Sequence, residues 1–140
     1  MSDKQFVHSI RMPIRWGDMD AMGHVNNTVY FRYIESARIA WLEQAGALPE
    51  PGGEGPVIVN AHCSFIKQLT YPGEIEVSTW VSPPGRSSFE VNHEIRLVDA
   101  DGRAGALHAQ GGAKVVWIDF QAEKSKPLPE RLRALLPTPG

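Results

Sequence analysis

The sequence lacks the residue combinations that build a cross-linked or metal-stabilised fold. Cys63 is the only cysteine, so no internal disulfide can form. The five histidines stand far apart, and with Cys63 they form no closely spaced ligand pair of the zinc-site kind. We therefore expect no metal, and a hydrophobic core has to stabilise the fold.

Long hydrophobic runs and a strong net charge are also missing. No stretch approaches the roughly 20 apolar residues that a membrane-spanning helix needs, and Asp3 and Lys4 stand where a signal peptide would be apolar. The formal charge is -2, and no broad basic face of the kind that nucleic acid requires can be read from the sequence. We expect a cytoplasmic protein with neither a membrane nor a nucleic-acid partner.

The motifs of several large enzyme classes do not occur. The sequence has no G-x-S-x-G elbow, no P-loop and no dinucleotide fingerprint, which disfavours serine hydrolases and nucleotide-driven enzymes and predicts no cofactor. His62 and Cys63 are adjacent, but successive strand residues point to opposite faces of a sheet, so they do not form a thiol–imidazole pair easily. We expect Cys63 in the core.

What is present suits one globular domain, residues 1–140. The hydrophobic share is 42% and the charged share 21%, ordinary values for a chain that buries a compact core. Residues 5–16 read as a strand in which Pro13 suggests an edge position or a bulge. A loop rich in Gly, Asp and Asn follows, with Asn26 or Asn27 as the predicted N-cap of an amphipathic helix over 28–45.

Beyond the helix the apolar residues recur with period two. This spacing predicts four antiparallel strands with turns between them, over 57–65, 75–81, 89–97 and 103–120. Gly111 and Gly112 suggest a bulge or bend in the last strand, and the tail 127–137 suggests a proline-initiated helix of about two turns. The predicted fold class is α+β, with one curved antiparallel sheet burying one face against the long helix.

Residues 15–38 carry the chemistry, and they read RWGDMDAMGHVNNTVYFRYIESAR. The pattern D-x-D-x-x-G-H-V-N-N, followed by Y-x-x-Y-x-E-x-A-R, resembles the 4-hydroxybenzoyl-CoA thioesterase family. The resemblance implies a hotdog fold, in which the sheet wraps the helix, and an acyl-CoA substrate. It also implies a homodimer or a dimer of dimers with active sites at the subunit interface.

The resemblance assigns roles to individual residues of the motif. Asp20 corresponds to the catalytic carboxylate, acting as general base or nucleophile, and the backbone N–H of Asn27 to the donor that polarises the thioester carbonyl. An acid just before a helix also faces unpaired backbone amides and the positive end of the helix dipole. His24 is either a base or, as we favour, a loop anchor, and Asp18 is expected to hold the loop.

A second, shorter similarity concerns the other end of the ligand. The segment GRSSFEV at 85–91 is similar to a strand segment that contributes to the family's coenzyme A site. Arg86, Ser87 and Ser88 are therefore candidates for phosphate contacts, since a guanidinium fits phosphate well. The alternative is an ordinary solvated turn.

Two other functions are compatible with such a domain. One is a non-catalytic acyl-CoA-binding hotdog module, which Asp20 disfavours because an apolar acyl pocket gains nothing from a carboxylate. The other is a hotdog dehydratase or hydratase, although the motif at 18–27 resembles the thioesterase branch. Hydrolysis of acyl-CoA is the leading prediction.

Overall fold

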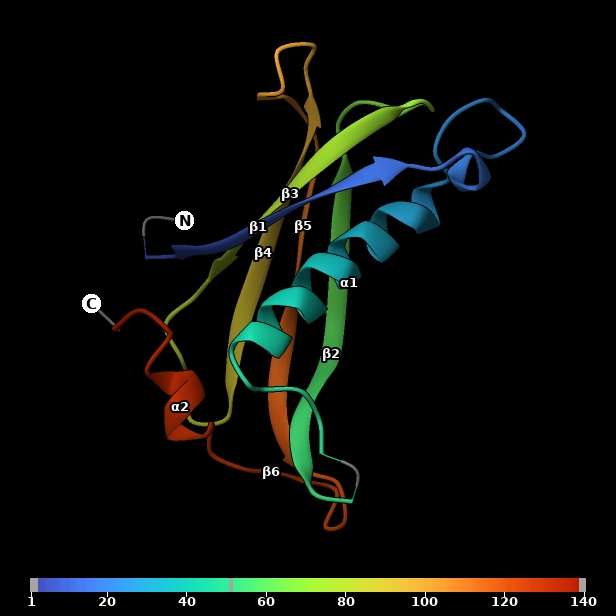
Figure 1. The fold of residues 1–140 in the computed structure, drawn as a ribbon. Helices are drawn as coiled ribbons and strands as arrows, with labels where there is room; N and C mark the ends of the chain where they lie inside the picture. Colours follow the sequence, from blue (N-terminus) through green and yellow to red (C-terminus); the bar gives the residue numbers. More distant parts are fainter. Residues whose placement is uncertain (1–2, 51, 139–140) are drawn as a thin grey trace.

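One curved antiparallel sheet and one long helix make up the architecture. The computed structural model describes residues 3–50 and 52–138, and its elements are shown in Figure 1. In chain order they are β1 Gln5–Ile14, the 3-10 turn η1 Trp16–Asp18, α1 Asn27–Gln44, β2 Glu54–Phe65, β3 Gly73–Val81, β4 Ser88–Val98, β5 Ala104–Asp119, β6 Lys124–Ser125 and α2 Glu130–Arg133. Helix α1 lies across one face of the sheet, which confirms the predicted α+β class.

The strand order is β1-β3-β4-β5-β2, with the short β6 added to β5. Strand β1 is therefore an end strand, paired with β3, and Pro13 stands opposite Glu74 near its end. A proline has no N–H to donate to a ladder, so an edge is where it is tolerated. The edge position predicted from Pro13 is confirmed.

Helix α1 begins and ends at the residues that its sequence favours. The Asn26 side chain caps it by accepting a hydrogen bond of 3.0 Å from the backbone N–H of Thr28. After Gln44 the chain turns through Gly46, whose φ of +69° suits a residue without Cβ. The buried face is Tyr30, Tyr33, Ile34, Ala37, Arg38, Trp41 and Leu42. The predicted amphipathic helix is confirmed, and Arg38 is an unexpected member of its buried face.

The core under α1 has two halves, one at each end of the helix. The half under the C-terminal end includes Trp41, Leu42, Val81, Phe89, Val91, Val115 and Trp117. The half under the N-terminal end includes Ile14, Val25, Tyr30, Tyr33, Ile34, Leu69, Ile75, Val77 and Ile95. On the strands between them lie Thr79 and His93, fully buried, with Thr79 Oγ1 3.0 Å from His93 Nδ1.

The glycine pair in β5 does not form the bulge suggested by the sequence. Pairing with both neighbouring strands runs through Gly111 and Gly112 without a change of register, and the irregular pairing with β4 lies nearer the start of β5. The pair instead permits close approach. A Cβ on Gly111 would lie 2.4 Å from the carbonyl oxygen of His62, and one on Gly112 would lie 2.6 Å from Asn92 Nδ2.

The tail is less helical than its sequence suggests. Helix α2 is a single turn of four residues after Pro129, where two turns were predicted. Its Arg133 guanidinium donates to the carbonyl oxygens of Gly85 and Arg86, so the tail closes over the β3–β4 turn. No helix in the described ranges is long and apolar enough to cross a membrane.

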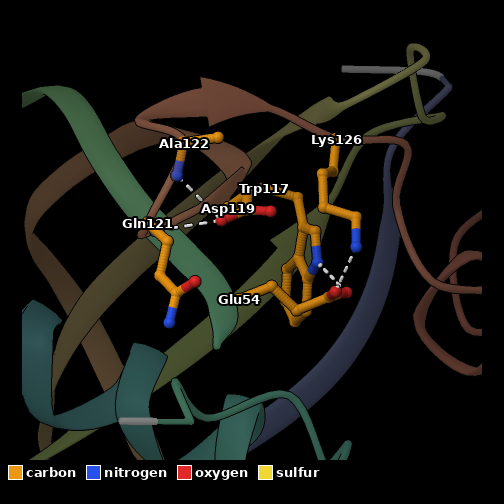
Figure 2. Close-up of polar contacts among 6 residues, drawn as sticks. All are labelled: Glu54, Trp117, Asp119, Gln121, Ala122 and Lys126. Atoms are coloured by element: carbon orange, nitrogen blue, oxygen red, sulfur yellow. Dashed lines mark hydrogen bonds and ion pairs between the residues drawn. The ribbon is translucent and has the colours of Figure 1, made fainter. Parts of the chain in front are cut away.

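Polar contacts close the end of the sheet near β6 (Figure 2). The Glu54 carboxylate accepts a hydrogen bond of 2.8 Å from the Trp117 indole N–H and forms an ion pair with Lys126. The Lys126 ammonium and then the indole lower the pKa of Glu54. Asp119 accepts from the backbone N–H groups of Gln121 and Ala122. This network fixes the β5–β6 turn, which lies at the end of the sheet away from the start of α1.

Candidate active site

Asp18 fixes the loop that precedes α1. Its carboxylate accepts a hydrogen bond of 2.9 Å from the backbone N–H of Arg15 and one of 2.6 Å from the hydroxyl of Tyr33. Its carbonyl oxygen also accepts from the N–H of Asn26 at 2.9 Å. Burial and the hydrogen bond to Asp18 raise the pKa of Tyr33, so the phenol stays a donor. The structural role predicted for Asp18 is confirmed.

Asp20 occupies a tight turn in the same loop. Its N–H donates to the carbonyl oxygen of His24 at 2.8 Å, and its Oδ1 accepts from the N–H of Met22 at 2.8 Å. Gly23, with φ of +83°, provides the left-handed residue that this turn requires. Within the described ranges the second carboxylate oxygen, Oδ2, accepts no hydrogen bond. The half-buried carboxylate is thus held by one oxygen, while the other remains available.

The three residues predicted to take part in catalysis line one pocket. Asp20, His24 and Asn27 surround an open pocket of about 360 Å³ at the N-terminal end of α1. Its remaining walls are Met22, Val25, Tyr30, Phe65 and Gln68. All but Gln68 are apolar or aromatic side chains, which suit an acyl or aryl group next to the carboxylate.

Asn27 is the first residue of α1, so its N–H has no partner within the helix. The capping groups of Asn26 bind the two residues after Asn27. The Asn26 side chain accepts from the N–H of Thr28, and its carbonyl oxygen accepts from the N–H of Val29. In the part of the chain that the structure describes, the N–H of Asn27 donates no hydrogen bond. It is therefore available to a ligand carbonyl at the positive end of the helix dipole.

Two walls of the pocket come from a distant segment that sequence reasoning missed. The hydroxyl of Tyr30 accepts from the N–H of Leu69 at 3.0 Å and donates to the carbonyl of Lys67 at 3.3 Å. These bonds hold the segment after β2 against α1 and bring Gln68 to the pocket. The ring of Phe65 lies across that of Tyr30, with centroids 5.1 Å apart. No motif marks Phe65 or Gln68 in the sequence, because only tertiary pairing brings them here.

The candidate phosphate-binding residues lie elsewhere on the subunit. Arg86, Ser87 and Ser88 form the β3–β4 turn and the start of β4, whereas the Asp20 pocket adjoins the segment that leads into β3. A nine-residue strand such as β3 is about 30 Å long. Within one subunit these residues therefore do not join Asp20.

The adjacent His62 and Cys63 make no nucleophilic pair. Cys63 is half-buried against the core half beneath the N-terminal end of α1, and burial raises the pKa of its thiol. His62 is exposed on the edge strand β2. The described ranges also hold no cluster of three or more His, Cys, Asp or Glu side chains that could bind a metal.

Comparison with known proteins gives a consistent relationship over most of the chain. The profile of the thioesterase-like superfamily matches residues 14–136. The PA2801 protein of Pseudomonas aeruginosa, a provisionally assigned thioesterase, is 35% identical, with a TM-score of 0.85 over 93% of this chain and 98% of its own. BH1999, a gentisyl-coenzyme A thioesterase, is 25% identical, with a TM-score of 0.75 over 91% of this chain and 98% of its own.

A match among curated sequences is more limited. Protein YsmA of Bacillus subtilis is 24% identical over 83 residues, which cover 59% of this chain and 56% of YsmA. The aligned part therefore spans little more than half of that relative. Taken with the solved structures, these likenesses confirm the hotdog architecture, a sheet wrapped around one long helix.

Proposed function

The chain belongs to the thioesterase-like superfamily, and on that premise we propose that it is an acyl-CoA thioesterase with Asp20 as its central carboxylate. The observation that carries this proposal is the shared pocket of Asp20, His24 and Asn27. Among the described residues, Asp20 Oδ2 accepts no hydrogen bond and the N–H of Asn27 has no partner. A base and an oxyanion donor are the two groups that thioester hydrolysis needs most.

In the proposed reaction the Asp20 carboxylate takes a proton from water as the water oxygen attacks the thioester carbonyl. The N–H of Asn27 donates to the oxyanion, and collapse of the tetrahedral intermediate breaks the C–S bond. The coenzyme A thiolate leaves and is protonated, and the acyl group becomes a carboxylic acid. A thiolate is a weak base, so the reaction needs little help at the leaving group.

A nucleophilic route uses the same groups. The Asp20 oxygen would itself attack the carbonyl, forming a mixed anhydride that water then hydrolyses. Label found in Asp20 after a single turnover in ¹⁸O-labelled water would identify the nucleophilic route, because water that attacks the Asp20 carbonyl of the anhydride leaves its oxygen there. We assign His24 a supporting role, since its backbone closes the loop and its ring lines the pocket.

The motif at 18–38 supports membership of the narrower 4-hydroxybenzoyl-CoA thioesterase family. The likeness to BH1999, which acts on a gentisyl thioester, and the aromatic wall of Tyr30 and Phe65 support aromatic acyl groups as substrates. The test is a thiol-release screen across aromatic and short-, medium- and long-chain acyl-CoAs. Acyl carrier protein thioesters are included, because the carrier presents the same pantetheine arm.

We also propose that the protein acts as a homodimer or a dimer of dimers. Strand β2 ends the sheet, and its outer edge pairs with no strand of the described residues. In β2 Val59 is 54% exposed and Phe65 47%, and Ile66, directly after the strand, is 48% exposed. An exposed edge with apolar side chains is a template for pairing with another chain. Sedimentation tests this, and a fully active monomer would contradict it.

The decisive variant is Asp20→Asn, which keeps the shape of the side chain but cannot accept the proton or attack. We expect it to fold, to retain most of its acyl-CoA binding and to lose about a hundredfold to ten-thousandfold in turnover. Asp101→Asn, an exposed turn position, is the matched control. A loss below tenfold would remove Asp20 from the central role. Binding of acyl-CoA without thiol release by the wild type would favour a binding module.

A further inference from the structure

Gln68 enters the pocket of Asp20 from a separate segment of the chain. Asp20 and His24 belong to the loop before α1, whereas Gln68 lies between β2 and β3. The N–H of Val25, which follows His24, donates to the carbonyl oxygen of Leu69 at 2.8 Å, and Leu69 directly follows Gln68. The N–H of Asp20 in turn donates to the carbonyl oxygen of His24 at 2.8 Å. Two backbone hydrogen bonds therefore connect the turn of Asp20 to the neighbour of Gln68.

The hydroxyl of Tyr30 holds the backbone on both sides of Gln68. It donates to the carbonyl oxygen of Lys67 at 3.3 Å and accepts from the N–H of Leu69 at 3.0 Å. Burial raises the pKa of Tyr30, so the phenol keeps the proton that it donates. Tyr30 is only 3% exposed, which makes this clamp part of the core. The backbone of Gln68 is thus fixed at the pocket, while its side chain is exposed.

Gln68 has the unoccupied polar side chain on its part of the pocket wall. Outside residues 20–27 the pocket is lined by Tyr30, Phe65 and Gln68. Phe65 is apolar, and the hydroxyl of Tyr30 is already bound to the backbone. Within residues 3–50 and 52–138 the Gln68 carboxamide makes no hydrogen bond, so its oxygen can accept and its nitrogen can donate.

We propose that Gln68 is a further catalytic residue, which orients the water that attacks the thioester. The inference rests on the thioesterase function proposed above and deepens it. Asp20 takes one hydrogen of the water as a proton. The carboxamide oxygen of Gln68 accepts a hydrogen bond from the second hydrogen, which stays on the oxygen and becomes the hydroxyl hydrogen of the tetrahedral intermediate. With both hydrogens held, a lone pair of the water points at the carbonyl carbon.

The proposed partners of the reaction favour the accepting oxygen of the carboxamide over its donating nitrogen. The developing oxyanion already has a donor in the N–H of Asn27, at the positive end of the helix dipole. The water has one acceptor in Asp20 and needs a second to fix its orientation. Gln68 supplies an acceptor from the segment that faces the same pocket.

Gln68→Ala tests the role directly, and the exposed position should let the variant fold. We expect turnover to fall about tenfold to a hundredfold, because the water loses its orientation. The Michaelis constant should change little. So should the affinity for a ketone analogue of the best substrate, in which a methylene group separates sulfur from carbonyl. Gln121→Ala, at an exposed glutamine of the β5–β6 turn, is the matched control. Unchanged turnover, or a proportionate loss of analogue binding, would overturn the proposal.

Gln68→Glu and Gln68→Lys separate accepting from donating, because a carboxylate only accepts and an ammonium only donates. Gln68→Glu should keep most of the turnover above neutral pH. The acid limb of its pH–rate profile should move to higher pH, since a second carboxylate in the pocket disfavours the ionised form of the first. Gln121→Glu should leave that limb in place. Gln68→Lys should be as slow as Gln68→Ala. An active lysine variant beside an inactive glutamate variant would assign Gln68 to the oxyanion and overturn the proposed role.

Tyr30 is a positioning residue in this scheme, because its hydroxyl acts through Gln68. Tyr30→Phe keeps the aromatic wall but releases the clamp, so turnover should fall, and adding Gln68→Ala should bring it no lower than Gln68→Ala alone. Fully additive losses would contradict the clamp. A wild type that releases no thiol would contradict the proposed function and this inference with it. An active wild type with Gln68 variants that match it would overturn this inference alone.

Discussion

Two aspartates of the motif, Asp18 and Asp20, stand two positions apart and have different surroundings. Asp18 receives the hydroxyl of Tyr33 and a backbone N–H, and both bonds reach the same oxygen. Asp20 receives backbone N–H groups on one oxygen, Oδ1, while its other oxygen accepts no hydrogen bond from the described residues, and the residue lines a pocket. A carboxylate bound by a buried phenol serves the loop, whereas one with a free oxygen can serve a substrate.

The bond between Tyr33 and Asp18 gives a prediction about the stability of the loop. Tyr33→Phe leaves the half-buried Asp18 carboxylate without its shortest hydrogen bond, so we expect the free energy of unfolding to fall by about 1–3 kcal/mol. Turnover should fall as well, because the loop also carries Asp20. Urea denaturation measures the first effect. Tyr71→Phe, at an exposed ring outside this contact, should change neither quantity, and an unchanged midpoint for Tyr33→Phe would refute the anchoring role.

His93 gives a second prediction, which concerns pH. Burial, and secondly the charge of Arg38, lower its pKa from 6.5 to about 3. Between these values the unfolded chain binds the proton and the native state does not, so stability falls as the pH drops from about 6.5 toward 3. The loss is about 1.4 kcal/mol per pH unit. His93→Gln removes this titration and should flatten the acid side of the stability profile, measured by urea denaturation at pH 7, 5.5 and 4.

The control for the pH prediction is His62→Gln, on the exposed edge strand. Its profile should follow that of the wild type. If His93→Gln kept the full acid dependence, other titrating groups would account for it.

At the scale of elements, the beginning of α1 links the fold to the chemistry. The Asn26 cap sets the direction of the first turn and so fixes where the N–H of Asn27 points. Asn26→Ala should cost about 1 kcal/mol of unfolding free energy and lower turnover more than it changes the Michaelis constant, because the proposed oxyanion donor, the N–H of Asn27, loses its fixed position. Asn26→Ser, which can still cap, should retain most of both. Equal activity in the two variants would separate the cap from catalysis.

The elements themselves follow from local sequence, and this explains which predictions succeed. Period-two and helical spacings depend on neighbours in the chain, so α1 and the four long strands are predicted from them, and Pro13 marks an edge. The glycine pair misleads because Gly111 and Gly112 serve contacts with other strands rather than a bulge. Phe65 and Gln68 reach the pocket only through the bonds of Tyr30 to the segment after β2, which no local pattern reveals.

At the scale of the whole molecule, one subunit separates the two parts of the proposed ligand site. The pocket of Asp20 adjoins the start of β3, whereas Arg86 follows the end of that strand. The carbonyl oxygen of Arg86 accepts from the N–H of Leu128 and from Arg133, which fixes the backbone and leaves the side chain exposed. The proposed dimer joins the two parts only if Arg86 of one subunit lies beside Asp20 of the other. The sequence alone could not give this separation, because it depends on the bonds of Tyr30 that bring the segment before β3 to the pocket.

The final prediction tests that arrangement. Arg86→Ala should raise the Michaelis constant for acyl-CoA more than it lowers turnover, as expected when a remote phosphate contact is lost. The effect should shrink with a truncated pantetheine thioester, which has no phosphates for Arg86 to bind. Arg103→Ala, at an exposed arginine in another turn, is the matched control.

Mixed dimers of Asp20→Asn and Arg86→Ala then decide which subunit supplies the arginine. If the site combines Asp20 of one subunit with Arg86 of the partner subunit, one of the two sites in each mixed dimer is intact and turns over with the wild-type Michaelis constant. If both groups came from one subunit, every site that keeps Asp20 would lack Arg86, and the Michaelis constant would stay raised.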